Sequence, residues 1–500
     1  MNLYQNEQLI VEQQNLFANL DHYIETEATE HELHKSEEII FHQLQKLGHI
    51  LLQRVIAKHG DGSKERSIQS IEGEQVPRYG KKSRQYHSIF GPITIERAYY
   101  WKPGNKGTCP LDAKLNLPYH SQSYLLQKWV QSGVADNPYE QTSQDLSELL
   151  NINLSSSEQQ LISRKVSERL PDYYKQKNTQ ETEGEILVAT SDCKGVAMVP
   201  SERPSQSKKN ASTRRGKGEK KKGLRKDAVV TSDYSFHPAS RRPDEIIEGL
   251  MKVNSNETKL FLQKKEPSKA RDRQPINKHV NACMFGKKQA ISDLADRLAR
   301  RDLSETRPIF VLLDGEKALK SRIQEEFTKR GWGGRVTGYC LDIIHAIEYL
   351  WDAGATLHGE KNPKRSSWVH QQTLALLDGR VGRVIGGLKQ ILRKRDSSLK
   401  KSQIQTLKGV ITYFENHRDM MCYDEYLKKG FPIATGIIEG ACSSLVKDRT
   451  DRSGMKWTKA GAQAVLNLRA LKQNGDWSAY WLYYMESERK RLYEPEDLAA

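Results

Sequence analysis

Paired cysteines and long apolar runs are both missing from this sequence of 500 residues. The six cysteines lie far apart without a Cys-x-x-Cys pair, which argues against a zinc cluster and against the disulfide framework of a secreted domain. No stretch of about 18 apolar residues is present, and the start, MNLYQNEQLIVEQQN, has neither the basic nor the apolar part of an export signal. We therefore expect a protein of the reducing cytoplasm with no membrane partner.

Acidic residues are too few to balance the basic ones. The chain carries 79 Lys and Arg against 63 Asp and Glu, a formal net charge of +16, which is typical of a protein that meets a polyanion. Residues 207–226, SKKNASTRRGKGEKKKGLRK, hold ten basic residues against one Glu and are expected to form a solvated loop, because nothing in them can pack a core. The loop interrupts a predicted catalytic sheet, which favours a further role in binding DNA phosphates for Lys208, Lys209, Arg214, Arg215, Lys217, Lys220, Lys221, Lys222 and Arg225.

The N-terminal part is predicted to be mainly helical. Residues 1–60 carry apolar positions at helical spacing, and two β-prone runs around Phe90-Gly91-Pro92 indicate a β-hairpin. Further on, a helix, the break NINLSSS and a second helix with a serine cap resemble a helix-turn-helix. Any two helices joined by a polar turn give the same pattern, so a plain helical pair and a DNA-reading motif both stay open.

A different pattern starts at residue 185. Three strands are predicted in EILVATSD, GVAMVP and DAVVTSDYSF, and then helices alternate with the strands PIFVLLDG and RVTGYCLD. This order predicts an α/β (α+β) domain with a mixed sheet flanked by helices, and it is also the order of an RNase H-like domain. Residues 360–428 are predicted to be entirely helical, and two more helices are expected over 437–448 and 459–474.

Two of the predicted strands end in an aspartate, Asp192 and Asp314, and groups beyond the carboxyl ends of neighbouring strands converge in one crevice. Paired carboxylates repel unless cations bridge them, and such oxygen ligands suit Mg²⁺ or Mn²⁺. Two such ions about 4 Å apart can promote in-line displacement at phosphorus, which is phosphodiester cleavage or strand transfer. Glu439, a lone acid in the small and apolar run GIIEGACSS, is the candidate for the third metal ligand. The basic residues that follow it are predicted to hold phosphates: Lys447, Arg449 and Arg452.

Each of these residues also has a purely structural interpretation. An aspartate after a strand is usually a turn former or helix cap, so only the three acids together favour catalysis. Asp342 and His345 lie three apart at a helix start, where His345 could donate to a scissile phosphate; alternatively, Asp342 only caps the helix and His345 is a satisfied core histidine. Trp351 and Trp368 could stack on a flipped DNA base, although core packing is the better explanation.

Four blocks of the chain resemble the ISKra family of bacterial insertion-sequence transposases: ATSDCKGVAM, FVLLDGEKAL, YCLDIIHAIEYLWDAG and the run from YFENHRDMM to LKQNGDW. The last block is the most specific, since IEGAC, VKDR and GMKW occur together in it, and the likeness covers most of residues 85–480. The resemblance implies a DDE transposase with an RNase H-like catalytic domain, an acid triad at Asp192, Asp314 and Glu439, and a helical insertion between the last two. The segment LDIIH looks like the aspartate-two-residues-histidine motif of related enzymes, which favours a catalytic His345. Relatives often carry a cysteine pair after the hairpin, but only Cys109 is present here, so no structural zinc is expected.

The activity implied is that of an enzyme of the bacterial cytoplasm and nucleoid. It would bind the double-stranded ends of its own element, cut them with two Mg²⁺ or Mn²⁺ ions per active site, and join them to target DNA as a homodimer or higher oligomer. Two alternatives stay open: an inactive DNA-binding remnant, and an RNase H-like nuclease that cuts without joining. The predicted organisation is a helical region for dimerisation or DNA binding (1–60), a β-hairpin module (80–120), a helix-turn-helix-like region (121–180), the catalytic domain (185–350 and 430–480), a helical insertion (351–429) and a C-terminal tail (481–500).

Overall fold

The computed structural model of the chain describes residues 3–64, 66–69, 74–104, 107–177, 182–202, 225–250, 274–395 and 399–494. The chain folds into two compact units. Unit 1 consists of Met1–Gln176 and Gly475–Ala500, and unit 2 consists of Lys177–Asn474. No helix within the described residues is long and apolar enough to cross a membrane.

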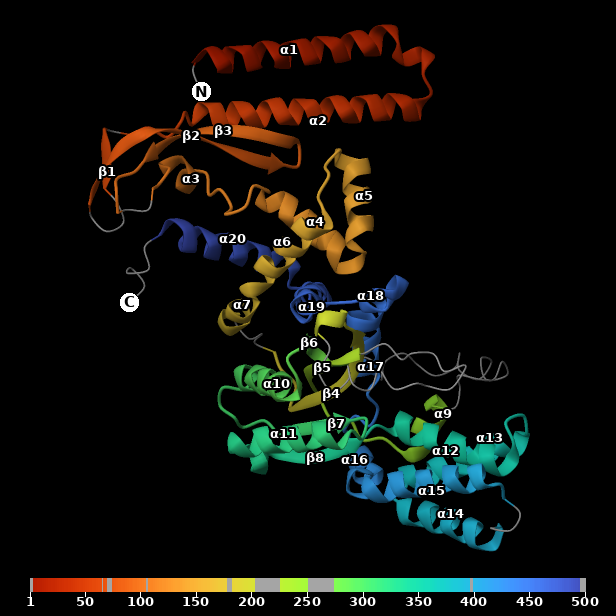
Figure 1. Cartoon of the computed structure of the whole chain (residues 1–500). Helices are drawn as coiled ribbons and strands as arrows, with labels where there is room; N and C mark the ends of the chain where they lie inside the picture. The colour runs from red at the N-terminus through yellow and green to blue at the C-terminus, as the bar shows by residue number, and fades with distance from the viewer. Residues whose placement is uncertain are drawn as a thin grey trace. The chain divides into compact units, whose positions relative to one another are not determined.

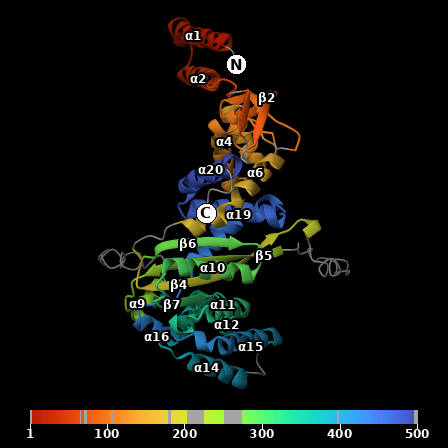
Figure 2. The same ribbon diagram turned by 90° about the vertical axis from the view of Figure 1, so that its left-hand side faces the viewer.

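Unit 1 begins with two long helices, α1 (Leu3–Thr26) and α2 (Leu33–Lys58), which lie side by side in opposite directions (Figures 1 and 2). A three-stranded antiparallel sheet follows, and Ile56 of α2 packs on it against Ile93 and Ile95. Its strands are β1 (Ser67–Gln69), β2 (Gln75–Ser88) and β3 (Gly91–Tyr100). The other helices of this unit are α3 (Pro110–Lys114), α4 (Tyr124–Asp136), α5 (Tyr139–Leu150), α6 (Ser156–Glu168), α7 (Leu170–Gln176) and α20 (Trp477–Tyr493).

Two details of unit 1 bear on the sequence predictions. Ser155 caps α6 as expected, in a capping box in which its hydroxyl accepts from the backbone N–H of Glu158. Residues 481–493 are predicted to be a tail, but they belong to α20, where Trp481 and Tyr484 are buried. The tail prediction is wrong there because these aromatic residues supply apolar surface that a helix can bury.

Unit 2 is built on a mixed five-stranded sheet in the order β6-β5-β4-β7-β8 (Figure 1). Strand β4 pairs antiparallel with β5 and parallel with β7, β5 pairs antiparallel with β6, and β7 pairs parallel with β8. The strands are β4 (Ile186–Ala197), β5 (Arg225–Phe236), β6 (Ile276–Cys283), β7 (Ile309–Leu313) and β8 (Val336–Leu341). The predicted α/β class and the mixed sheet are confirmed.

The strand prediction is wrong in two places. EILVATSD and GVAMVP are not two strands but one, because β4 pairs continuously with β5 from Ile186 to Ala197, and Gly195 lies opposite Asp227 instead of breaking the strand. Strand β6 is absent from the prediction. Its sequence, INKHVNAC, lacks an apolar run because β6 lies at the edge of the sheet and pairs only with β5.

The helices of unit 2 share one apolar core with the sheet. Leu294 of α10, Ile323 of α11 and Leu350 of α12 are fully buried in it. Phe414 comes from the predicted insertion and lies in the same core, so residues 351–429 extend the domain rather than forming a separate one. The bounds are α9 (Pro243–Leu250), α10 (Lys287–Arg301), α11 (Lys317–Lys329), α12 (Ile343–His358), α13 (Pro363–Leu377), α14 (Val381–Arg395), α15 (Lys401–Asn416), α16 (Tyr423–Lys428), α17 (Gly436–Ala441), a π-helical segment (Cys442–Lys447), α18 (Asp448–Thr450) and α19 (Lys459–Gln473).

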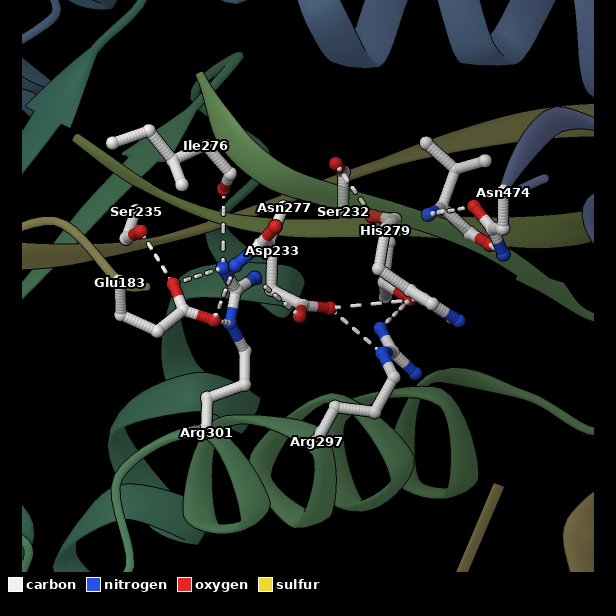
Figure 3. A network of polar contacts seen from close by, with 12 residues as sticks. Glu183, Ser232, Asp233, Ser235, Ile276, Asn277, His279, Arg297, Arg301 and Asn474 are labelled. Carbon is white, nitrogen blue, oxygen red and sulfur yellow. Dashed lines mark hydrogen bonds and ion pairs between the residues drawn. The ribbon is translucent and has the colours of Figure 1, made fainter. Parts of the chain in front are cut away.

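A buried ion network fastens α10 to the sheet (Figure 3). Arg297 Nε donates to Asp233 Oδ1 over 2.7 Å, and Arg301 Nη1 donates to Asp233 Oδ2 over 3.0 Å. Arg301 also donates to Glu183 Oε2 over 2.7 Å. Burial alone would raise the pKa of Asp233, but Arg297, His279 and Arg301 outweigh burial and lower it to about 2. Both arginines of this network are therefore paired, which fixes α10 on strand β5.

Candidate active site

Three aspartates lie in one row in the sheet of unit 2, one inside β4 and the other two directly after the carboxyl ends of β7 and β8. In the parallel pairing of β4 with β7, Ser191 lies opposite Leu313, so Asp192 and Asp314 are the next residues of the two strands. In the pairing of β7 with β8, Leu313 lies opposite Leu341, which Asp342 follows directly. The predicted convergence of Asp192 and Asp314 is thus explained by strand register. The prediction that Asp192 ends its strand is wrong, since Asp192 is paired with Val230 inside β4.

The loop after β7 is held tightly around Asp314. Asp314 Oδ1 accepts from the backbone N–H of Glu316 over 2.9 Å, and its carbonyl oxygen accepts from the Tyr413 hydroxyl over 2.8 Å. His417 Nε2 lies 2.7 Å from the carbonyl oxygen of Gly315. Gly315 has φ +97°, and a Cβ there would come within 2.7 Å of the Tyr413 hydroxyl, so only glycine fits without a shift. Helix α15 therefore positions this acid through backbone contacts.

The carboxyl groups of Asp192 and Asp314 interact directly. Burial, and after it the neighbouring Asp192, raise the pKa of Asp314 to about 6, while His345 opposes the shift. On the other side, the Cys442 thiol donates to Asp192 Oδ2 over 3.2 Å, and burial and Asp192 hold the pKa of this thiol well above its usual range. The two half-buried acids therefore form a pair whose full ionisation is costly without a cation.

Glu439 lies on α17, whose helical run packs against β4. The Glu439 side chain is exposed. It lies nearest to Asp342 and His345, whereas the predicted partners are Asp192 and Asp314. Its carboxylate shares a group with Asp342 and His345 in which the three ligand atoms lie within 4.8 Å of one another. Among the described residues, Asp192, Asp314 and Glu439 do not form such a group by themselves. Burial, Asp342 and, more weakly, Asp192 raise the pKa of Glu439, so it belongs to the same acidic cluster.

Asp342 and His345 join the two halves of this cluster. Asp342 is fully buried, its Oδ1 caps α12 by accepting from the Ile344 N–H over 2.9 Å, and Thr435 donates to its Oδ2. The helix-cap interpretation of Asp342 is therefore confirmed. His345 is half-buried and is not a core histidine; its Nδ1 lies 3.0 Å from Glu348 Oε2. Burial lowers the pKa of His345, but Asp342, Glu348 and Asp314 outweigh burial, and the net shift is upward.

The donor atoms of the cluster fit a hard divalent cation. Asp192 and Asp314 offer carboxylate oxygens side by side, which are the ligands that Mg²⁺ and Mn²⁺ prefer. The pKa of Asp314 is raised by burial and then by repulsion from Asp192, and a bound cation would relieve this repulsion. Asp342, His345 and Glu439 offer a second group of possible metal ligands, next to Asp192 and Asp314.

The predicted phosphate contacts have different surroundings. Lys447 and Arg452 are exposed, as a phosphate contact requires. Arg449 is fully buried, with its guanidinium 4.9 Å from the Trp457 ring centroid, so the prediction that it holds a phosphate is wrong: the side chain packs inside the unit. Arg225 is exposed but donates to Asp451 over 2.9 Å. The eight predicted contacts between Lys208 and Lys222 lie outside the described residues.

Several residues at the site have no signal in the sequence. The Cys442 thiol and the Tyr413 hydroxyl reach Asp192 and Asp314 from 250 and 99 residues away. The helix carrying Glu439 continues as a π-helix over Cys442–Lys447. Such wide turns are rare and occur frequently at functional sites.

The two tryptophans considered for base stacking have a structural role. Trp351 and Trp368 pack against the core of unit 2, in agreement with the packing interpretation. Arg365 lies over the Trp351 ring, with its guanidinium 4.8 Å from the ring centroid. Neither ring is therefore assigned to the site.

Protein-family models were compared with the whole chain, and none matches it; no curated protein matches it significantly either.

Proposed function

We propose that this chain is a DDE transposase whose unit 2 is an RNase H-like catalytic domain. The observation that supports the proposal most strongly is the pair of Asp192 and Asp314 at adjacent positions of two parallel strands, with Glu439 nearby on a helix packed against the same sheet. The sheet order β6-β5-β4-β7-β8, with the first three strands antiparallel, agrees with the strand order of that fold.

The reaction proposed is hydrolysis followed by strand transfer. Water attacks a phosphorus atom at the element end, and the bond from this phosphorus to the 3′ oxygen breaks. The free 3′-hydroxyl then attacks a phosphorus of the target DNA, and the bond from that phosphorus to the 3′ oxygen of the target strand breaks, leaving a 3′-hydroxyl on the target. Two Mg²⁺ or Mn²⁺ ions, when bound, would activate the attacking oxygen and stabilise the charge on the leaving oxygen. Asp192, Asp314 and Glu439 would hold the ions.

The other residues of the cluster would act on the phosphate and on protons. His345 is biased towards its protonated form by three acids and can donate to a phosphate oxygen or to the leaving oxygen. Lys447 and Arg452, both exposed on the chain segment after Glu439, would hold the DNA backbone. Two element ends must meet for joining, so a homodimer or larger oligomer on DNA is part of the proposal.

The test uses a supercoiled plasmid that carries the DNA flanking the coding region on both sides, incubated with Mg²⁺. We expect the parent protein to nick and join the element ends, and Glu439→Gln and Asp314→Asn to lose cleavage at least 1,000-fold while DNA affinity changes less than about threefold. Asp448→Asn is the matched control, since Asp448 is an exposed acid in the same helical run. Tight binding by a parent protein that never cleaves would identify an inactive DNA-binding remnant, and cutting without joining would identify a plain nuclease.

A further inference from the structure

Helices α1 and α2 expose an apolar face that the fold of unit 1 does not use. The exposed residues of α2 are spaced seven, four, seven and four apart, which places them on one stripe of the helix. On α1 the corresponding residues are seven apart. We name these residues the hairpin face: Phe17 and Ile24 of α1, and Leu33, Ile40, Leu44, Leu51 and Val55 of α2, with exposed fractions from 36% to 84%.

Both stripes lie on the same side of the helix pair. The Tyr23 hydroxyl donates to Ser36 Oγ over 2.8 Å, and Arg54 donates to Gln13, so these residues mark the contact between the helices. Ile24 comes one residue after Tyr23, and Val55 comes one residue after Arg54. One residue corresponds to a rotation of about 100° around the helix axis. In antiparallel helices this rotation turns both side chains toward the same side of the plane through the two axes. The hairpin face is therefore one continuous apolar surface.

The fold already uses another face of α2. Ile56 is buried against β3, and His49 Nδ1 lies 3.0 Å from the carbonyl oxygen of Phe90. The hairpin face is thus not an unfinished part of the core of unit 1. Large exposed apolar patches of this kind mark interaction sites in soluble proteins.

The charges of the two helices select the partner. Helix α1 carries four acids and no Lys or Arg, whereas α2 carries four Lys and Arg against two Glu. DNA and anionic lipid surfaces are both disfavoured by the charge of α1. A second copy is favoured, because a two-fold axis parallel to the helices sets α1 of each copy against α2 of the other, so helices of opposite net charge face each other.

The size of the face is sufficient for a stable dimer. Helices of 24 and 26 residues are about 36–39 Å long and about 10 Å wide, so together they present roughly 700 Å² per copy. Stable protein interfaces bury about 600–1,000 Å² per partner, a range that includes this area. We propose that two copies of this chain associate through their hairpin faces into a four-helix bundle, and that they do so without DNA.

The test is the mass of the full chain in solution, measured by light scattering after gel filtration at about 10 μM and without DNA. We expect the parent protein to have twice the chain mass of 57.2 kDa, and Leu44→Glu with Leu51→Glu to have the single mass. Val11→Glu is the matched control, and this variant should remain a dimer. Val11 is an exposed apolar residue of α1, and it lies six residues before Phe17, which places it about 120° around the helix from the hairpin face. A monomeric parent protein, or a dimeric double variant, would overturn the proposal.

A second double variant is used if the first one loses its helical circular dichroism signal. Phe17→Gln with Ile24→Gln is a milder change on α1, and we expect it to raise the dimer dissociation constant at least tenfold at unchanged helix content. Binding to a duplex of random sequence separates the alternatives. If the Leu44→Glu and Leu51→Glu variant keeps its mass but loses DNA affinity tenfold, the hairpin face binds DNA and the proposal is wrong. Strand cleavage is not measured in this test, so its failure would leave the proposed chemistry unaffected.

Discussion

Replacing Asp314 by asparagine should make the metal-free protein more stable. The pKa of Asp314 is raised to about 6 from its ordinary value of 3.8, mainly by burial and then by Asp192. In the pH range between these two values, the unfolded chain has already lost the proton that the folded chain still holds. The contribution of Asp314 to stability is therefore most favourable below about pH 4 and falls as pH rises through 6, above which the whole penalty is present.

The magnitude follows from the shift. About two pKa units correspond to about 3 kcal/mol, but the carboxyl group is only half-buried, and solvent screening reduces the effect to about 1–2 kcal/mol. The asparagine side chain would keep the acceptor for the Glu316 N–H and remove only the charge. For a unit of this size, we expect Asp314→Asn to raise the unfolding temperature of unit 2 by about 2–4 °C at pH 7.5.

The assay is thermal unfolding in EDTA at pH 7.5 and at pH 4, with Asp448→Asn as the control that should shift neither transition. The gain of Asp314→Asn should be much smaller at pH 4, where the carboxyl is protonated in the folded state and partly protonated in the unfolded chain. Adding 10 mM Mg²⁺ should stabilise the parent protein by about 1.4 kcal/mol if the dissociation constant is about 1 mM, and should stabilise the variant much less. An equal gain at both pH values, or a variant less stable than the parent at pH 7.5, would refute the idea that the ionised Asp314 carboxylate destabilises the fold.

Three further predictions concern residues around the site. Asp233→Asn leaves the charges of Arg297 and Arg301 buried with weaker partners, so it should lower the free energy of unfolding in urea by about 3–5 kcal/mol. In the parent protein, the stability that Asp233 contributes is present above about pH 4 and is lost as pH falls toward 2. Arg449→Ala should lower the urea midpoint without changing the salt dependence of DNA binding, because this side chain is buried; a reduced salt slope with unchanged stability would contradict that placement. Lys447→Ala should reduce the slope of log affinity against log salt by about 1 and leave stability unchanged, and an unchanged slope would count against a phosphate contact.

Local patterns in the sequence determined most helices and four of the five strand positions of unit 2. Periodic apolar residues predict α10, α11 and α12, and the apolar runs ending at Asp192 and Asp314 place both acids on central strands. Strand β6 is missed because an edge strand needs no apolar run, and β4 is divided because a glycine in a strand resembles a turn when its pairing partner is unknown. The sequence also identifies Asp342, His345 and Glu439 as candidates, each with an open structural alternative.

Only the tertiary structure decided which of these residues meet and which are covered. Strand register, a property of pairing between segments far apart in the chain, set Asp192, Asp314 and Asp342 in one row. The helical run formed by α17, the π-helical segment and α18 packs on β4, which brings Glu439 beside Asp342 and His345. The same packing buries Arg449 and leaves Lys447 exposed. The sequence contains the types of residue that chemistry requires, but burial and proximity arise from contacts across hundreds of residues, which local periodicity does not encode.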